Sequence, residues 1–457
     1  MSSRTRAVRL IAAVVIFAAC CGSPAASVPT TTTVVVTTTT LPDPAYVPPE
    51  CADTPAITVA SGVSDTTIAA PAPLTTDQQL DVLDGVDNAV RDQYVYPDFN
   101  GTDWDSAVAA LASRVEAGID AAAFYQAIDE LVASLGDDHS YHESPAEVIA
   151  GEAELAATHD YVGIGSMVLP VQDKGLVTVL AVFPGSAAEH AGLQIHDNIH
   201  VIDGVPLTEP GAYTKLRGPE CSLIVMEVSS PGGSDRVLTA IRFRVEGGIP
   251  VTSRLVPTED GTKIGYILIP TLADGSADDQ ARAALEGFGE LDGLILDLRV
   301  NGGGSSSVLV PLLALFNSGT LGDFVSRDGT RPLEIAADGV QNSQTVPLIV
   351  LIDEDTESYA EVLAGTLSAE GRAVLIGETS QGNVETLTGY ELEDGSKLWL
   401  AHETFVPRAD PGAGWERSGV VPDVVVASAW EEFTFETDPA IQAALEVFAA
   451  RSVWVME

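Results

Sequence analysis

GLILDLRVNGGG, residues 293–304, joins a near-continuous apolar run to a glycine-rich turn. Two further apolar runs, 263–269 and 346–352, lie in the same part of the chain, and a helix-like segment follows each of them. Uninterrupted apolar strands of this length are typical of a sheet that is covered on both faces. The pattern therefore predicts an α/β core over residues 247–457, with the functional residues at the ends of its strands.

The third run leads into DTESYAE, residues 355–361, which opens a predicted helix that continues through Leu367. A serine at a helix start is often only an N-cap. The turn at 302–304, however, supplies backbone N–H groups of the kind that stabilise an oxyanion. Ser358 is therefore a candidate nucleophile.

Residues 155–246 change to short β-rich runs separated by glycine and proline. The order of YVGIG at 161–165, PGSAAEHAGL at 184–193 and DNIHVIDG at 197–204 closely resembles a PDZ domain. In such a domain the backbone of Val162, Gly163, Ile164 and Gly165 cradles the carboxylate of a peptide C-terminus, beside a strand edge that pairs with the peptide. The alternative is a degenerate module that only packs against its neighbour.

Residues 77–152 carry apolar side chains at three- and four-residue spacing, which predicts an N-terminal helical domain. Its last helix runs into Gly136 and the polar triplet 138–140, so His139 is expected in a loop just beyond a helix end. A loop histidine is ordinarily solvated, and His139 becomes notable only with the motifs described below.

Residues 1–19 combine three arginines with a short apolar run, which predicts a secretory signal peptide and hence export. The sequence FAAC at 17–20 resembles a bacterial lipobox, with Cys20 favoured over Cys21 as the lipidated residue. Residues 20–76 are rich in threonine and proline and are expected to form an extended tether that holds the protein at the cell envelope by a lipid anchor alone.

The composition limits the partners of the protein. It has 22 Lys+Arg against 66 Asp+Glu, a formal charge of −44, which disfavours nucleic acids and anionic membrane surfaces. A hydrophobic content of 46% is enough for a folded body. Four cysteines make neither a disulfide scaffold nor a zinc ribbon, and whether Cys51 and Cys221 pair is left open. No motif calls for a metal or a cofactor.

The order of parts over residues 77–427 resembles the C-terminal processing (tail-specific) peptidase family, with 296–304 as its strand and turn and 358–361 as its nucleophile motif. The resemblance implies that Ser358 is the nucleophile. It also implies an oxyanion hole formed by the N–H of Tyr359 and that of Gly303 or Gly304.

One departure concerns the base. Many members use a lysine in a Gly-Lys-Gly segment, whereas residues 381–384 read QGNV here, and Lys397 is the only lysine after Ser358. A tricorn-like branch of the family uses histidine and glutamate instead. His139, before the PDZ-like region, and Glu416, in WERSGVVPD at 415–423, match that branch.

The chemistry of these three side chains supports the same assignment. A serine hydroxyl needs an adjacent base, histidine titrates in a suitable range, and a carboxylate orients the histidine and stabilises its cation. His142 and His402 are competing candidates for the base. The leading hypothesis is an exported serine endopeptidase acting on polypeptide tails. The main alternative is a catalytically inactive, peptide-binding scaffold, while no residue favours a third possibility, a carrier of apolar small molecules.

Overall fold

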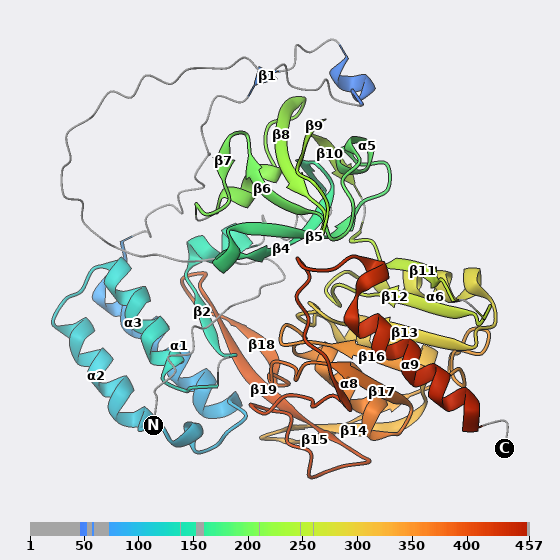
Figure 1. Ribbon diagram of the computed structural model, residues 1–457. Helices are drawn as coiled ribbons and strands as arrows, with labels where there is room; N and C mark the ends of the chain where they lie inside the picture. The colour runs from blue at the N-terminus through green and yellow to red at the C-terminus, as the bar shows by residue number, and fades with distance from the viewer. Residues whose placement is uncertain are drawn as a thin grey trace, which may run out of the picture. The chain divides into compact units, whose positions relative to one another are not determined.

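The computed structural model describes residues 46–52, 57–58, 73–137, 139–151, 160–209, 211–246, 248–258 and 260–454 (Figure 1). The expected signal peptide, Cys20 and most of the tether lie outside these residues. The chain forms two compact units, the first from residues 1–62 and 161–245 and the second from 63–160 and 246–457. Among the described residues, no helix combines the length and apolar character needed to cross a membrane.

The first unit is a β-rich module. Its seven-stranded sheet has the order β1-β8-β6-β5-β4, with β7 on β6 and β9 on β8, and β10 pairs with β3 apart from it. The elements are η1 (Pro49–Cys51), β1 (Ile57–Thr58), β3 (Asp160–Gly163), β4 (Ser166–Val171), η3 (Gln172–Lys174), β5 (Leu176–Val182), α5 (Ala187–Ala191), β6 (Asn198–Ile202), β7 (Val205–Pro206), η4 (Ala212–Leu216), β8 (Ser222–Ser229), β9 (Arg236–Ile241) and β10 (Phe243–Glu246).

A disulfide joins Cys51 to Cys221, which answers the pairing question that the sequence left open. The bond links Cys51, within the expected tether, to the residue before β8, and both cysteines lie in the first unit. Strand β4 is at the edge of the sheet, which leaves one of its sides without a neighbouring strand of this sheet.

The second unit is built around a six-stranded sheet of order β11-β12-β13-β16-β17-β20. Only the β11–β12 pair is antiparallel. The three predicted apolar strands are confirmed as β12 (Ile264–Leu268), β13 (Gly293–Asp297) and β16 (Leu348–Ile352), and every residue in them is buried. The remaining members are β11 (Thr252–Val256), β17 (Ala373–Gly377) and β20 (Val424–Val425).

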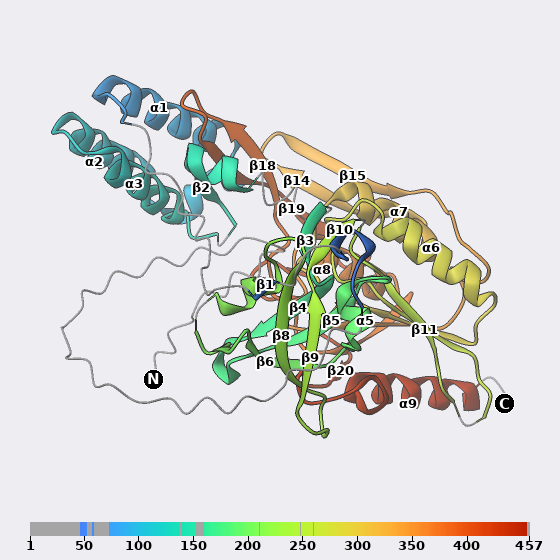
Figure 2. The ribbon, with the colours of Figure 1, turned by 90° about the horizontal axis from the view of Figure 1, so that it is seen from above.

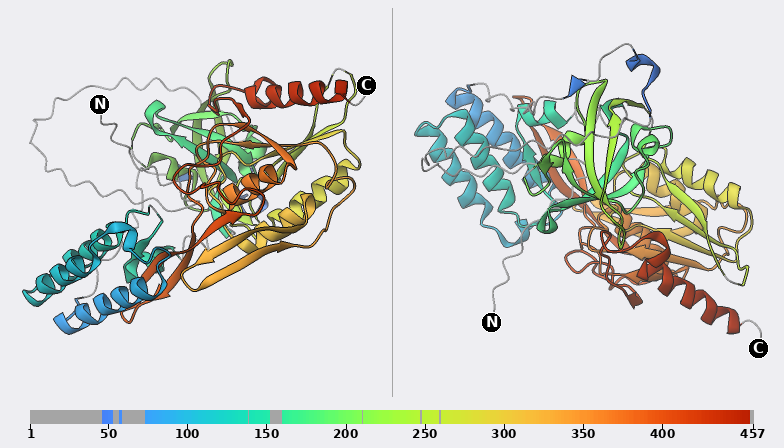
Figure 3. Two further views of the ribbon diagram at one scale, coloured as in Figure 1. Left: turned by 90° about the horizontal axis from the view of Figure 1, so that it is seen from below. Right: turned by 45° about the horizontal axis from the view of Figure 1, so that its top comes forward.

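Helices cover both faces of this sheet, as the continuous apolar strands require. The helices α6 (Ala277–Phe288), α7 (Ser306–Phe316) and α8 (Tyr359–Ala369) share one apolar core with the sheet. Helix α9 (Pro439–Trp454) packs on β13 and β17. Figures 2 and 3 show α9 on the opposite side of the sheet from α6 and α7. The parallel strands thus end together at one edge, where their connecting loops meet.

A second sheet, of order β15-β14-β19-β18 with β2 on β19, carries the helical region. Apolar residues of α1, α2 and α3 pack on Leu398, Leu400 and Ala401 of β19. Helices α1, α2 and α3 confirm the helices predicted from the apolar spacing, and all three lie in the second unit. The bounds are α1 (Thr76–Gln93), η2 (Phe99–Gly101), α2 (Trp104–Glu116), α3 (Ala121–Ala133), β2 (Tyr141–Glu143), β14 (Gly319–Ser326), β15 (Gly329–Ile335), β18 (Thr386–Glu391), β19 (Lys397–Pro407) and η5 (Phe435–Thr437).

Candidate active site

Ser358 lies between β16 and α8, at the carboxyl end of the central sheet. Its backbone has φ 56° and ψ −127°, a region that costs a non-glycine residue about 1–3 kcal/mol. The surrounding chain holds this conformation: the N–H of Ser358 donates to Glu361 Oε2 at 3.0 Å, and the N–H of Glu357 donates to the carbonyl of Asn301 at 2.9 Å. Strain retained at such a turn is a common mark of a functional residue.

The buried carboxylate of Glu361 joins the nucleophile turn to the loop that follows β17. It accepts hydrogen bonds from Ser380 Oγ at 2.5 Å, from the N–H of Gly382 at 2.7 Å and from the N–H of Asn383 at 2.8 Å. Asn383, where the resemblance would place a lysine, donates through Nδ2 to Glu357 Oε1 at 2.6 Å. An amide that is held in this way orients its neighbours and supplies no base.

The glycine-rich turn packs directly on the serine. A Cβ on Gly303, which has φ +82°, would lie 2.7 Å from Ser358 Cβ and 3.1 Å from the backbone nitrogen of Tyr359. The N–H of Gly303 already donates to Asn301 Oδ1 at 2.9 Å. Of the two expected glycine donors, Gly303 therefore has its N–H already engaged. Tyr359 is the first residue of α8, where backbone N–H groups have no partner within the helix.

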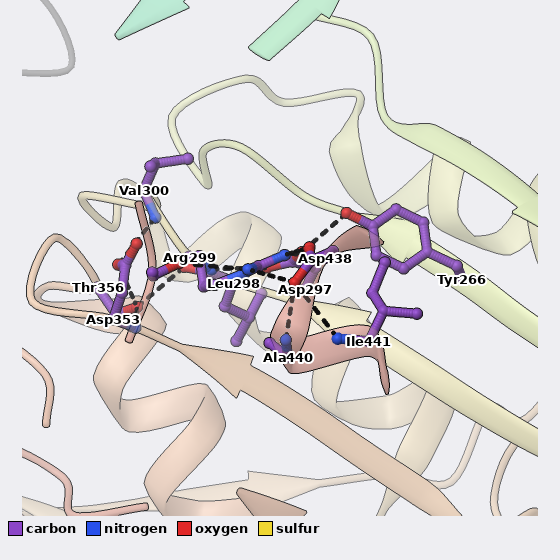
Figure 4. Close-up of polar contacts among 11 residues, drawn as sticks. Tyr266, Asp297, Leu298, Arg299, Val300, Asp353, Thr356, Asp438, Ala440 and Ile441 are labelled. Carbon is purple, nitrogen blue, oxygen red and sulfur yellow. Dashed lines mark hydrogen bonds and ion pairs between the residues drawn. The ribbon is translucent and has the colours of Figure 1, made fainter. Parts of the chain in front are cut away.

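A buried ionic network lies at the start of the glycine-rich turn (Figure 4). The guanidinium of Arg299 lies between Asp297, at 2.6 Å, and Asp438, at 2.7 Å, and all three side chains are buried. The N–H of Val300 donates to Asp353 Oδ1 at 3.0 Å. Asp438 immediately precedes α9, so the network links the start of the glycine-rich turn to the C-terminal helix.

His139 lies in the loop after α3, and Asp137 shapes that loop. One carboxylate oxygen of Asp137 accepts from the N–H of His139 at 3.0 Å and from the N–H of Ser140 at 2.7 Å. Ser140 Oγ donates to the other oxygen at 2.7 Å and accepts from the N–H of Ala401 at 3.0 Å. Ser140 therefore anchors the loop to β19. Asp138 lies outside the described residues.

His139 and Ser358 line the same pocket, which has a volume of about 340 Å³. Three of its lining side chains, Tyr141, Leu387 and Trp399, provide apolar or aromatic surface. The rings of Tyr141 and Trp399 are stacked with centroids 6.1 Å apart. The other lining residues are Gly302, Gly304, Glu357, Tyr359, Glu385 and Thr386. The structure thus brings together segments that lie more than 200 residues apart in the sequence.

Glu416 lies beside the histidine, together with a second glutamate, Glu385. One ligating atom from each of His139, Glu385 and Glu416 lies within 4.8 Å of the others. Burial lowers the pKa of His139 to about 4, against the attraction of Asp137, so the imidazole is neutral at neutral pH. Burial raises the pKa of Glu416 to about 7 and that of Glu385 to about 8. The negative charge of Glu416 adds to the shift of Glu385, and that of Glu361 adds to the shift of Glu416.

The competing bases lie elsewhere in the second unit. His142 Nδ1 contacts Asp129 Oδ1 at 3.0 Å, and its ring stacks on Tyr125. His402 Nδ1 lies 3.5 Å from the hydroxyl of Tyr390. The ammonium of Lys397 lies over the ring of Trp399, 4.4 Å from its centroid. None of these three residues lines the pocket at Ser358.

The expected peptide-binding loop occupies the turn between β3 and β4 in the first unit. The carbonyl of Ile164 accepts from the N–H of Ala188 at 2.7 Å, and the carbonyl of Gly165 accepts from the N–H of Phe183 at 3.0 Å. Gly165 has φ +76°, and a Cβ there would lie 2.4 Å from Ser186 Cβ, so the loop packs closely on the start of α5. Val162 and Gly163 are the last two residues of β3, and the edge strand β4 begins directly after Gly165.

Sequence reasoning missed Glu385 and its partner Tyr96, whose hydroxyl donates to Glu385 Oε1. The available signal was weak: Glu385 is an acid two residues after the position of the missing lysine. Its burial beside His139 depends on contacts between distant segments, which spacing along the chain does not reveal.

Comparisons with known proteins agree with this site. The model of peptidase family S41 matches residues 263–426. The chain is 30% identical over 332 residues to a carboxyl-terminal-processing protease of Synechocystis sp., covering 71% of this chain and 76% of the relative. It is 29% identical to the enzyme of that name from Picosynechococcus sp., covering 81% and 89%. The solved photosystem II D1 C-terminal processing protease superposes with a TM-score of 0.52 at 27% identity, over 77% of this chain and 93% of that one. The chain therefore belongs to peptidase family S41 and is a serine peptidase of the carboxyl-terminal-processing type.

Proposed function

We propose that the protein is an exported serine endopeptidase that cleaves polypeptides near their C-termini through an acyl-enzyme at Ser358. The observation that carries the proposal is the strained backbone of Ser358 at the start of α8, in a pocket that it shares with His139. The names of the relatives, carboxyl-terminal-processing protease and photosystem II D1 C-terminal processing protease, support tails as the substrate class.

In the proposed reaction, Ser358 Oγ attacks the scissile carbonyl carbon while its proton passes to the neutral imidazole of His139. The N–H groups of Gly304 and Tyr359, with Gly303 shaping the turn between them, stabilise the oxyanion. His139 then gives the proton to the departing amine as the C–N bond breaks. A water molecule, deprotonated by His139, hydrolyses the ester and releases Ser358.

Glu416 is proposed to orient His139 and to stabilise its cation. Its Oε2 accepts from the N–H of Val384 at 3.1 Å, which directs the carboxylate. A neutral base is available from the start because burial lowers the pKa of His139 to about 4. Asn383 occupies the position of the family lysine, and its side-chain amide donates to Glu357, so it supplies no base. These observations support His139 as the base.

The wall of the pocket suggests which side chains are accepted. Tyr141, Leu387 and Trp399 offer apolar surface beside Ser358, and burying apolar area there is favourable by about 25 cal/mol per Å². Substrates with an apolar side chain next to the scissile bond are therefore expected to be cleaved fastest. An acidic residue at that position would lose hydration and would meet the acidic side chains of Glu357 and Glu385.

We further propose that the first unit captures the substrate tail. An edge strand, β4, follows the loop formed by Val162, Gly163, Ile164 and Gly165, which supports strand addition by an extended peptide whose carboxylate is held at the loop. In the proposed organisation, residues 155–246 form a PDZ domain between a helical region at 77–152 and a peptidase core at 247–457.

Export and anchoring complete the proposal: a signal peptide at 1–19, lipidation at Cys20 and a tether over 20–76. The disulfide between Cys51 and Cys221 supports an oxidising compartment. Incorporation of labelled fatty acid into the protein, expressed in a bacterium with lipoprotein machinery, tests the anchor. We expect incorporation to be lost in Cys20→Ser and kept in the matched control Cys21→Ser. The reverse pattern would move the lipid to Cys21.

A serine-reactive fluorophosphonate probe tests the catalytic assignment. The wild-type protein should be labelled and Ser358→Ala should not be. His139→Ala should reduce the labelling rate by about 10³-fold or more. His402→Ala, a histidine outside the pocket, and Lys397→Ala serve as controls and should retain labelling. Loss of labelling in Lys397→Ala but not in His139→Ala would replace the histidine base by lysine.

The same experiment addresses the inactive-scaffold alternative. A scaffold would bind tail peptides equally well with and without Ser358, and would neither react with the probe nor cleave casein. Labelling of the wild-type protein alone rejects that alternative.

A further inference from the structure

A buried cluster of possible metal ligands lies at the histidine. His139 is 8% exposed and Glu385 is 1% exposed, while Glu416 is half-buried. They come from three separate segments of the second unit: the loop after α3, the residue before β18 and the turn before β20. Ligating atoms of the three side chains lie within 4.8 Å of one another.

Two atoms of this cluster lack partners. Within the part of the chain that the structure describes, Nε2 of His139 and Oε2 of Glu385 are buried and make no hydrogen bond. Buried polar atoms are nearly always paired, because leaving one unpaired costs about 1–3 kcal/mol. A ligand that binds nitrogen and carboxylate oxygen together would satisfy both atoms.

The other atoms of the glutamates are already held in place. The hydroxyl of Tyr96 donates to Glu385 Oε1, and the N–H of Val384 donates to Glu416 Oε2 at 3.1 Å. Each carboxylate is thus oriented through one oxygen, an arrangement common among metal ligands.

The ligand set indicates which cation fits. One imidazole and two carboxylates, with a position left open, suit Zn²⁺, whereas Ca²⁺ and Mg²⁺ prefer oxygen ligands alone. Ligand atoms around one tetrahedral zinc lie roughly 3.3 Å apart, so side-chain movements of about 1 Å would close the set. We propose that His139, Glu385 and Glu416 bind Zn²⁺ and that the bound ion reversibly inhibits the peptidase.

Inhibition follows from the chemistry of imidazole and rests on the proposed role of His139 as the base. A neutral imidazole has one basic nitrogen lone pair, and its other nitrogen carries the proton. Once zinc accepts that lone pair, neither nitrogen can take the proton of Ser358. No bond in the protein is broken, so removing the ion restores the base. The expectation that catalysis needs no metal is unchanged, because this ion opposes the reaction.

Calorimetric titration of Zn²⁺ into the full chain carrying Ser358→Ala, after treatment with EDTA, measures binding without any dependence on peptidase activity. We expect one ion per chain. In that background, Glu385→Gln should weaken Zn²⁺ binding by at least about 100-fold. Tyr96→Phe should weaken it by about 10-fold, because it removes only the hydrogen bond that orients Glu385. Glu357→Gln, a glutamate of the same pocket outside the cluster, is the matched control and should bind as before.

Fluorophosphonate labelling of the wild-type protein should fall on addition of Zn²⁺ and return with EDTA, while Mg²⁺ and Ca²⁺ at a hundredfold higher concentration should have no effect. The site would be overturned if the Ser358→Ala protein bound no Zn²⁺. It would also be overturned if adding Glu385→Gln or Glu416→Gln left the affinity for Zn²⁺ unchanged. Binding without loss of labelling would overturn the inhibition. If the wild-type protein never reacts with the probe, the catalytic proposal fails, whereas the calorimetric result still decides whether the metal site exists.

Discussion

Replacing Arg299 by methionine is expected to destabilise the second unit severely. Arg299 is completely buried, and its guanidinium donates to Asp297 Oδ2 at 2.6 Å and to Asp438 Oδ2 at 2.7 Å. It also lies over the ring of Trp430, 4.5 Å from the centroid. Methionine keeps most of the side-chain length and removes the charge, so both aspartates are left buried without their cation (Figure 4).

The magnitude follows from the burial. Removing one partner of a buried ion pair costs about 3–5 kcal/mol, because the remaining charge has neither water nor a counterion. The lost contact with Trp430 contributes up to about 2 kcal/mol and overlaps with the first effect. Arg282 is the matched control: it pairs with Asp338 at 2.5 Å, but both side chains are partly exposed. Arg282→Met should cost less than about 1 kcal/mol.

Urea denaturation followed by tryptophan fluorescence is a suitable assay, because all five tryptophans lie in the second unit. With a slope of about 3 kcal/mol per molar urea, Arg299→Met should lower the midpoint by roughly 1–2 M. Asp438→Asn reduces the uncompensated charge, so adding Arg299→Met in that background should cost less than it does alone.

A cost below about 1 kcal/mol for Arg299→Met, similar to that of Arg282→Met, would refute the reasoning. It would mean that water or a changed protonation state compensates the aspartates, and that the network does not hold the glycine-rich turn. A full cost without coupling to Asp438→Asn would assign the effect to packing alone.

Two further predictions concern the catalytic turn and its base. In Gly303→Ala the new Cβ would lie 2.7 Å from Ser358 Cβ at a φ of +82°, so fluorophosphonate labelling should slow by about 10²-fold or more. The control Gly275→Ala, whose Cβ meets nothing within 4 Å, should be labelled at the wild-type rate. Equal labelling rates for the two variants would contradict the close packing. Burial lowers the pKa of His139 to about 4, so this base loses its free lone pair only as pH falls toward 4. In Glu416→Gln, which has no carboxylate to titrate at that position, labelling measured in EDTA should therefore keep the same rate from pH 7.5 to pH 5.5. A decline centred near 6.5 in that variant would show an unshifted histidine.

Much of the architecture was predictable from local patterns. The apolar runs that form β12, β13 and β16 are read directly from the sequence because strands buried on both faces admit no polar interruption. The helices at 76–133 follow from their apolar spacing. Ser358 was recognisable because it lies at a helix start after one predicted strand, while a glycine-rich turn follows the preceding predicted strand.

Resemblance to a family contributed what spacing could not. His139 and Ser358 are separated by more than 200 residues, and only motif order linked them before the structure brought both to one pocket. The roles of His139 and Glu416 remain predictions for the labelling experiment to test.

By itself, the sequence determined the strands, the helices and the candidate nucleophile, because these depend on side-chain periodicity and on neighbours within a few residues. Only the tertiary structure decided that Cys51 bonds to Cys221, that His139 shares a pocket with Ser358, and that Glu385 lies beside His139. Each of these depends on the distance between atoms in segments or side chains whose approach is set by packing. Hydrogen bonding, metal binding and pKa shifts all vary steeply with that distance, and no spacing along the chain encodes it.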